Sequence, residues 1–137
     1  MGSEMCIRDR ALGLQRSGLT EEQIREKVEA TLRVCGLYPF RNWPVSALSF
    51  GQKKRVTIAS ILVMNPEILI LDEPTSALDE KNASHFYRLL KKINAEKRIT
   101  VLMVTHDLKR ASSYADDIWV LEDGKVKQEA GKGDGQA

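Results

Sequence analysis

Two adjacent carboxylates at the end of a short apolar run are the first side chains in this sequence that could do chemistry. The run, Ile68 to Leu71, has no polar–apolar alternation, which is typical of a strand buried on both faces of a parallel sheet. Asp72 and Glu73 follow it, and Pro74 lacks the N–H that would continue the strand. Open α/β sheets bind ligands beyond the carboxyl ends of their strands, so these carboxylates suit a magnesium–nucleotide site, one holding the metal and the other handling water. A solvated acidic turn after a core strand is the alternative at this point.

A second stretch could bind phosphate. Ser49 is a good helix cap, Gly51 permits close approach of the backbone, and residues 56–63 indicate a largely buried helix that stops before Pro66. The start of such a helix offers free N–H groups and a positive dipole end to an anion. Residues 53–55, two lysines and an arginine, either add positive potential there or only face solvent. The helix start lies just one helix before the Asp72-Glu73 strand, which strengthens the interpretation.

Amphipathic helices are predicted on either side of these stretches. A capping box at residues 20–23 begins one helix, which Gly36 ends, and Asp79 can cap another. The apolar faces consist of Ile24, Val28, Leu32 and Cys35 in the first helix and of Ala83, Phe86, Tyr87, Leu90 and Ile93 in the second. His85 lies off the second face, and we expect it to be a surface residue without chemistry.

A further run without alternation, Ile99 to Val104, predicts another buried strand. It ends in Thr105-His106-Asp107, so His106 should reach the same sheet edge as the two carboxylates. The remaining predicted elements are a helix over 108–115, a strand over 118–121, a turn at Asp123-Gly124 and a short strand around Val126.

The composition is that of an ordinary globular domain. The chain has 137 residues, of which 42% are hydrophobic and 29% charged, and its net charge of +2 is too small to indicate nucleic acid or an anionic membrane as a partner. No apolar stretch approaches the ~20 residues that span a bilayer. Cys6 and Cys35 show neither metal-ligand spacing nor a disulfide framework, which favours a reducing cytosol.

The two ends of the chain differ from the rest. Residues 5–10 resemble one translated frame of a transposon end used in preparing sequencing libraries, so we expect residues 1–10 to be a non-native leader and exclude them from fold reasoning. Residues 131–137 are small and polar, and we expect a flexible tail.

Taken in order, the stretches resemble the motifs of ABC ATPases. Residues 48–52, Leu-Ser-Phe-Gly-Gln, are similar to the family's signature sequence, and residues 68–73 to its Walker B strand with the following glutamate. Residues 76–79 resemble the D-loop, and His106 stands at the position of the switch histidine. The signature stretch and the helix before it are most similar to energy-coupling-factor importers for vitamins and metals. The part from Ser76 onward is less similar to that group and suits a metal-ion importer equally well. A gene assembled from two sources is therefore an open alternative.

The resemblance implies a role for each matching residue, with ATP and Mg²⁺ as cofactors. Asp72 would position magnesium through water, Glu73 would be the general base, and His106 would hold the γ-phosphate and the attacking water. An ordinary capping histidine is the alternative for His106. The signature residues Ser49, Gly51 and Gln52 would close over a nucleotide on the opposite subunit of a head-to-tail dimer, and Asp79 would pass information across that interface. Phe50 replaces the family's commonest glycine.

The resemblance also implies how the chain is organised. It contains no G-x-x-x-x-G-K-[ST] phosphate loop, which the family places N-terminal to these motifs. We therefore expect an α/β fold, a partial P-loop NTPase in which a RecA-like parallel sheet with flanking helices accompanies the helical signature subdomain. Residues 11–66 would form the helical subdomain and residues 67–130 the C-terminal half of the RecA-like core.

The function expected from the resemblance is the ATP-hydrolysing subunit of a membrane importer. Its partners would be a second ABC ATPase subunit and transmembrane permease subunits, with no nucleic acid, at the cytoplasmic face of the membrane. An inert truncated fragment and a soluble ABC ATPase of DNA repair or translation are the alternatives.

Overall fold

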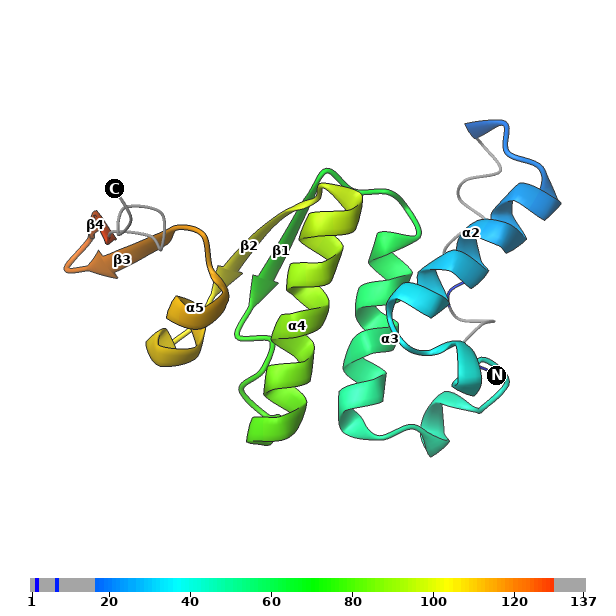
Figure 1. The fold of residues 1–137 in the computed structure, drawn as a ribbon, viewed down its shortest axis with the longest axis horizontal. Helices are drawn as coiled ribbons and strands as arrows, with labels where there is room; N and C mark the ends of the chain where they lie inside the picture. Colours follow the sequence, from blue (N-terminus) through cyan, green and yellow to red (C-terminus); the bar gives the residue numbers. More distant parts are fainter. Residues whose placement is uncertain (1, 3–6, 8–16, 130–137) are drawn as a thin grey trace.

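Residue 2, residue 7 and residues 17–129 are described by the structure, a computed structural model. The first half of the described chain is helical, and in the second half two helices lie between the strands (Figure 1). In chain order the elements are helix α2 (Glu21–Val34), the 3₁₀ helices η2 (Tyr38–Phe40) and η3 (Val45–Ala47), α3 (Phe50–Leu62), β1 (Ile68–Asp72), α4 (Glu80–Lys97), β2 (Thr100–Val104), α5 (Leu108–Tyr114), β3 (Ile118–Glu122) and β4 (Lys125–Glu129). A mixed α/β fold is thereby confirmed.

Side-chain caps set where the helices begin. Thr20 and Ser49 each form a capping box with the glutamine three residues later, and Asp79 accepts a hydrogen bond from the Asn82 N–H. Each cap satisfies a backbone donor that would otherwise have no acceptor in the first turn. All three cap positions were predicted from the sequence and are confirmed.

Two separate two-stranded sheets are present among the described residues. β1 and β2 are parallel and in register, with Ile68 opposite Thr100 and Asp72 opposite Val104. β3 and β4 form an antiparallel hairpin around the predicted Asp123-Gly124 turn. Both turn residues have positive φ, 49° and 72°, which is the conformation that a tight hairpin turn needs.

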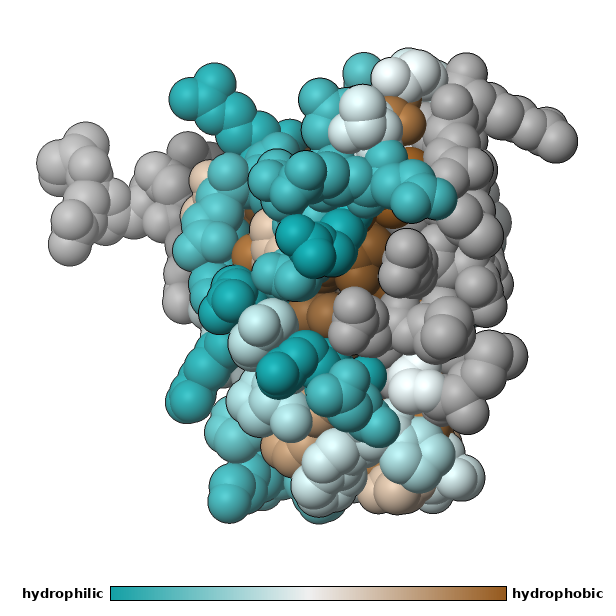
Figure 2. Space-filling view, turned by 90° about the vertical axis from the view of Figure 1, so that its right-hand side faces the viewer, coloured by the Kyte–Doolittle hydropathy of each residue, from teal (hydrophilic) through white to brown (hydrophobic). Residues whose placement is uncertain are grey.

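The core lies between the helices and one face of the parallel sheet. In Figure 1, α4 stands in front of β1 and β2, and α3 stands beside α4. Leu69 in β1 is 2% exposed and belongs to the same apolar cluster as residues of α2, α3 and α4. The predicted stripe of α4 is buried, as are Ile24, Val28, Leu32 and Cys35. The outer surface over α2 is mostly hydrophilic, with small patches of hydrophobic residues between the polar ones (Figure 2).

The apolar runs predicted that both strands are buried on both faces, and among the described residues this prediction is wrong. Ile70 is 67% exposed and Leu102 55% exposed, while their neighbours Leu69 and Val101 face the core. The helices described here cover only one side of the sheet, and successive side chains of a strand point to opposite faces. An apolar face of β1 and β2, formed by Ile68, Ile70, Leu102 and Val104, is therefore exposed.

The predicted boundaries near the chain ends fall partly outside the described residues. The tail over 131–137 lies outside them, as does most of the leader over 1–10, including Cys6. Two residues of the leader are described: Gly2 forms an isolated bridge with Pro44, and Ile7 is fully buried in the core cluster. The division of the chain at residue 66 stays a prediction.

Candidate functional site

The ends of several elements meet at one end of the molecule. β1 and β2 both point downward in Figure 1, and α3 and α4 both begin at that lower end. The parallel ladder continues one residue past β1, because the Glu73 N–H donates to the Val104 carbonyl at 2.8 Å. Glu73 and His106 are thus delivered together by neighbouring strand ends, as the sequence predicted from strand order alone.

Glu73 is held in an unusual state. Its φ is 44°, in the left-handed region, and its Oε1 has no contact with solvent and accepts no hydrogen bond. Among the described residues, the one basic side chain paired with that oxygen is His106, whose Nε2 lies 3.6 Å away and whose side chain is 97% exposed. Strained backbone and an unsatisfied buried acceptor both cost stability, and such costs are concentrated at functional sites. Glu73 is therefore the strongest candidate for a reacting group in the described chain.

The carboxylates fit a magnesium–nucleotide site but not a metal site made of protein alone. Asp72 is exposed at the strand end beside Glu73. Within residues 17–129 no group of three or more His, Cys, Asp or Glu side chains could hold a metal ion. Mg²⁺ commonly keeps several waters and binds through one or two carboxylates together with substrate phosphates. Asp72 suits a site of that kind, in which a phosphate-bearing ligand would complete the coordination of Mg²⁺.

The side chains of Ser49 and Gln52 each accept a hydrogen bond from the other residue's backbone N–H. Ser49 Oγ accepts from the Gln52 N–H at 3.2 Å, and Gln52 Oε1 accepts from the Ser49 N–H at 2.8 Å. The first-turn N–H groups of Phe50 and Gly51 have no acceptor within a helix, and they begin the exposed end of α3. An anion at this end would therefore meet backbone donors without breaking the cap.

Asp79 and Gly51 come together through a residue that the sequence reasoning missed. Both Asp79 oxygens are taken by Asn82: Oδ1 accepts from its N–H at 2.7 Å and Oδ2 from its Nδ2 at 3.0 Å. These hydrogen bonds, first the backbone one and then the side-chain one, hold the pKa of Asp79 below its ordinary value of 3.8. The other side of the Asn82 amide lies against Gly51, where an added Cβ would be 3.3 Å from Oδ1. The only sequence signal for Asn82 was its place three residues after a cap.

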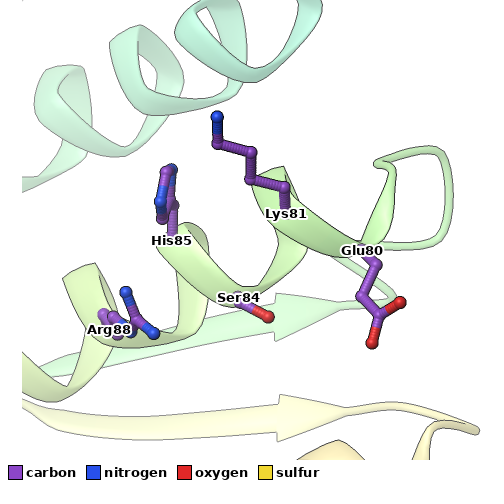
Figure 3. Close-up of a pocket in the computed structure, with 5 residues that line it drawn as sticks. All are labelled: Glu80, Lys81, Ser84, His85 and Arg88. Carbon is purple, nitrogen blue, oxygen red and sulfur yellow. The ribbon is translucent and has the colours of Figure 1, made fainter.

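A hollow on α4 lies apart from these groups. It measures about 450 Å³ and is lined by Glu80, Lys81, Ser84, His85 and Arg88, all from one helix (Figure 3). Lys81 and His85 extend to one side of the helix, while the Glu80 carboxylate points away from them. None of the predicted site residues lines this hollow.

Comparison with known proteins gives one consistent family. The family model described as "ABC transporter" matches residues 3–76, more than half of the chain. A Clostridium perfringens protein assigned as an ABC transporter ATP-binding protein is 50% identical over 121 residues, which is 88% of this chain and 21% of that protein. A Staphylococcus aureus protein with the same assignment is 50% identical over 127 residues, 92% of this chain and 22% of its own length. The chain thus spans about a fifth of these relatives.

Solved structures show the same fold. The structure of cbiO1 from Clostridium perfringens, part of the ABC transporter complex cbiONQ, matches with a TM-score of 0.82 and 39% identity, over 89% of this chain and 49% of that one. A metal-chelate type ABC transporter in an inward-facing conformation matches with a TM-score of 0.77, and its 22% identity supports the fold alone. Within residues 17–129, no helix is both long and apolar enough to cross a membrane.

Proposed function

The chain belongs to the ABC transporter family, with the P-loop NTPase fold of its ATPase domain, and we propose that it forms the catalytic part of an ATP-hydrolysing importer subunit. A vitamin or metal ion is the proposed substrate class, supported by the resemblance of the signature stretch at residues 48–52 to that of energy-coupling-factor importers. The site at the ends of β1 and β2 would then act on ATP with Mg²⁺.

Glu73 is the proposed general base. The observation that carries this role is its buried Oε1, which has spare lone pairs and no hydrogen-bond donor. The Glu73 side chain as a whole is 31% exposed, so a water can approach the carboxylate, which can accept a proton from it. His106 Nε2 lies 3.6 Å from Glu73 Oε1, and His106 is proposed to hydrogen bond to the terminal phosphate and to help hold the attacking water.

The other residues are proposed to bind rather than react. Asp72 would orient Mg²⁺ through water, and the bound ion would neutralise charge on the phosphates. Ser49, Gly51 and Gln52 would contact the nucleotide of a second subunit in a head-to-tail dimer, using the exposed first turn of α3. Asp79 would contribute to the same interface from the first turn of α4.

The proposal also states where the protein works and what the 137-residue chain can do alone. Partners would be a second ATPase subunit and transmembrane permease subunits, with the protein peripheral at the cytoplasmic face of the membrane. The chain contains no G-x-x-x-x-G-K-[ST] sequence to hold the β- and γ-phosphates. By itself it is proposed to turn over no ATP, and added polypeptide carrying that loop would be needed for activity.

The test compares variants in a protein that joins this chain to the phosphate-loop half of the cbiO1 domain. Glu73→Gln keeps the shape of the side chain and removes the base, so kcat for ATP hydrolysis should fall by about 10²–10⁴-fold. Glu67→Gln, just before β1, is the matched control and should leave kcat unchanged. Equal turnover by the parent and Glu73→Gln would overturn the role of Glu73. ATP turnover by the 137 residues alone, abolished by Glu73→Gln, would show that no further loop is needed.

A further inference from the structure

We propose that Asn82 is a positioning residue that joins the first turn of α3 to the first turn of α4, so that Gly51 and Asp79 are held as one unit. The inference rests on the proposed function for its consequences in catalysis, although its structural part stands alone. Nothing in the resemblance assigns a role to Asn82.

The Asn82 side chain is fixed from the α4 side. Its Nδ2 donates to Asp79 Oδ2 at 3.0 Å, while its own backbone N–H donates to Oδ1 at 2.7 Å. This pair of hydrogen bonds occupies both oxygens of one carboxylate and leaves the amide little freedom to rotate. Hydrogen bonds to a charged acceptor are also stronger than neutral ones.

The same amide packs on α3. A Cβ built on Gly51 would lie 3.3 Å from Asn82 Oδ1, 3.5 Å from its Cγ and 3.7 Å from its Cβ. Gly51 does not have a positive φ, so its backbone conformation alone does not require glycine. The contact with Asn82 is the structural reason for glycine at this position within the chain itself. A side chain there would require the amide to shift by a few tenths of an ångström, against its hydrogen bond to Asp79.

The consequence is a mechanical link between two loops that the proposed function places at one subunit interface. Displacing the α3 start moves the Asn82 amide, and the amide is hydrogen bonded to Asp79. Signature residues and Asp79 would thus approach a partner subunit together. Loss of Asn82 should affect the closed, reacting state more than the binding of nucleotide.

A double-mutant cycle tests the link by thermal unfolding of the full chain. Alanine is favoured over glycine within a helix, so Gly51→Ala should stabilise unless it displaces a fixed neighbour. We expect Gly51→Ala to lower Tm by about 3 °C in the parent chain and to leave it unchanged or raise it in the Asn82→Ala background, a coupling of a few degrees. Ser84→Ala, one half-turn further along α4, is the control background and should leave the effect of Gly51→Ala unchanged. The same change in Tm in all three backgrounds would overturn the proposal.

A catalytic measurement separates a positioning role from simple packing. In the protein joined to the phosphate-loop half, Asn82→Ala should lower kcat at least 5-fold with KM for ATP changed less than 2-fold, in the pattern expected for loss of an interaction made in the reacting state. Equal effects on kcat and KM, or none, would overturn the catalytic part of the inference. If the joined protein without substitutions hydrolyses no ATP, the proposed function fails. The double-mutant cycle measured by thermal unfolding still decides whether Asn82 joins the two helices.

Discussion

Replacing Glu73 by glycine should make this chain more stable while removing its proposed base. Glu73 combines a φ of 44° with a buried carboxylate oxygen that has no hydrogen-bond partner. Three other residues that are not glycine share a positive φ: Asn65, Arg98 and Asp123. Asn and Asp tolerate this conformation, and Arg98 is an exposed helix C-cap, so Glu73 is the one whose side chain adds a second cost.

The size of the gain follows from four contributions. The left-handed backbone costs roughly 1–2 kcal/mol, and a buried acceptor without a partner costs roughly 1–3 kcal/mol. Against these, glycine costs roughly 0.5–1 kcal/mol in chain entropy, and loss of the partly buried methylenes costs about 1 kcal/mol. The net expectation is a stabilisation of about 1.5 kcal/mol, or about 5 °C in Tm for a chain of this length.

Two matched variants separate the backbone from the carboxylate. Glu73→Met keeps the strained backbone and the packing but removes the polar oxygens, and should stabilise by about 1–2 kcal/mol. Arg98→Gly relieves a φ of 53° where no buried polar atom is involved, and should stabilise by about 0.5–1 kcal/mol.

The assay is urea unfolding monitored by circular dichroism, and free energies of unfolding are compared between variants whose m-values are equal. If Glu73→Gly and Glu73→Met both destabilise the chain, then the carboxylate is satisfied in solution and the reasoning is wrong. If Glu73→Met has no effect while Glu73→Gly and Arg98→Gly stabilise equally, then the backbone strain costs stability but the buried carboxylate of Glu73 adds no further cost.

Three more predictions concern the core and the titrating groups. Leu69→Ala should cost about 2–4 kcal/mol in urea unfolding and the neighbouring Ile70→Ala less than about 1 kcal/mol, because only Leu69 is buried; equal losses would contradict the one-sided core. Asp79→Ala should lower Tm at pH 7, and this deficit should shrink as the pH falls below 3.8, since a lowered pKa stabilises only while the carboxylate is charged. Iodoacetamide at pH 8 should label Cys35 only in denaturant, because burial raises the pKa of its thiol to about 12; mass spectrometry of the peptide would show rapid labelling of the folded chain if this is wrong.

The local features of the fold could be predicted from the sequence because their causes are local. Thr20, Ser49 and Asp79 were expected to cap helices, and each accepts a hydrogen bond from the backbone N–H three residues later. The Asp123-Gly124 turn was expected to form a hairpin, and it does. A cap or a tight turn needs only a few adjacent residues, so the pattern of residue types was sufficient.

The surroundings of the strands could not be predicted in the same way. The apolar run over 68–71 shows which side chains a strand can bury, whereas the amount buried depends on which elements cover each face. Residues 17–129 supply helices for the face of Leu69, and Ile70 on the other face is 67% exposed. A similar limit applies to Asn82, since its contact with Gly51 joins residues 31 positions apart (82 minus 51) and has no signature in either local stretch.

The candidate site brings together side chains that already have hydrogen-bond partners and one carboxylate oxygen that has none among the described residues. Ser49 Oγ and Gln52 Oε1 each accept from the other residue's backbone N–H, and both Asp79 oxygens accept from Asn82, so these side chains are held in a fixed geometry. Glu73 Oε1 has no hydrogen-bond donor within the part of the chain that the structure describes. Preorganised groups favour binding at low entropy cost, while a carboxylate oxygen without a donor keeps acceptor capacity for the role of a general base. This division supports assigning recognition to the starts of α3 and α4 and proton transfer to the end of β1.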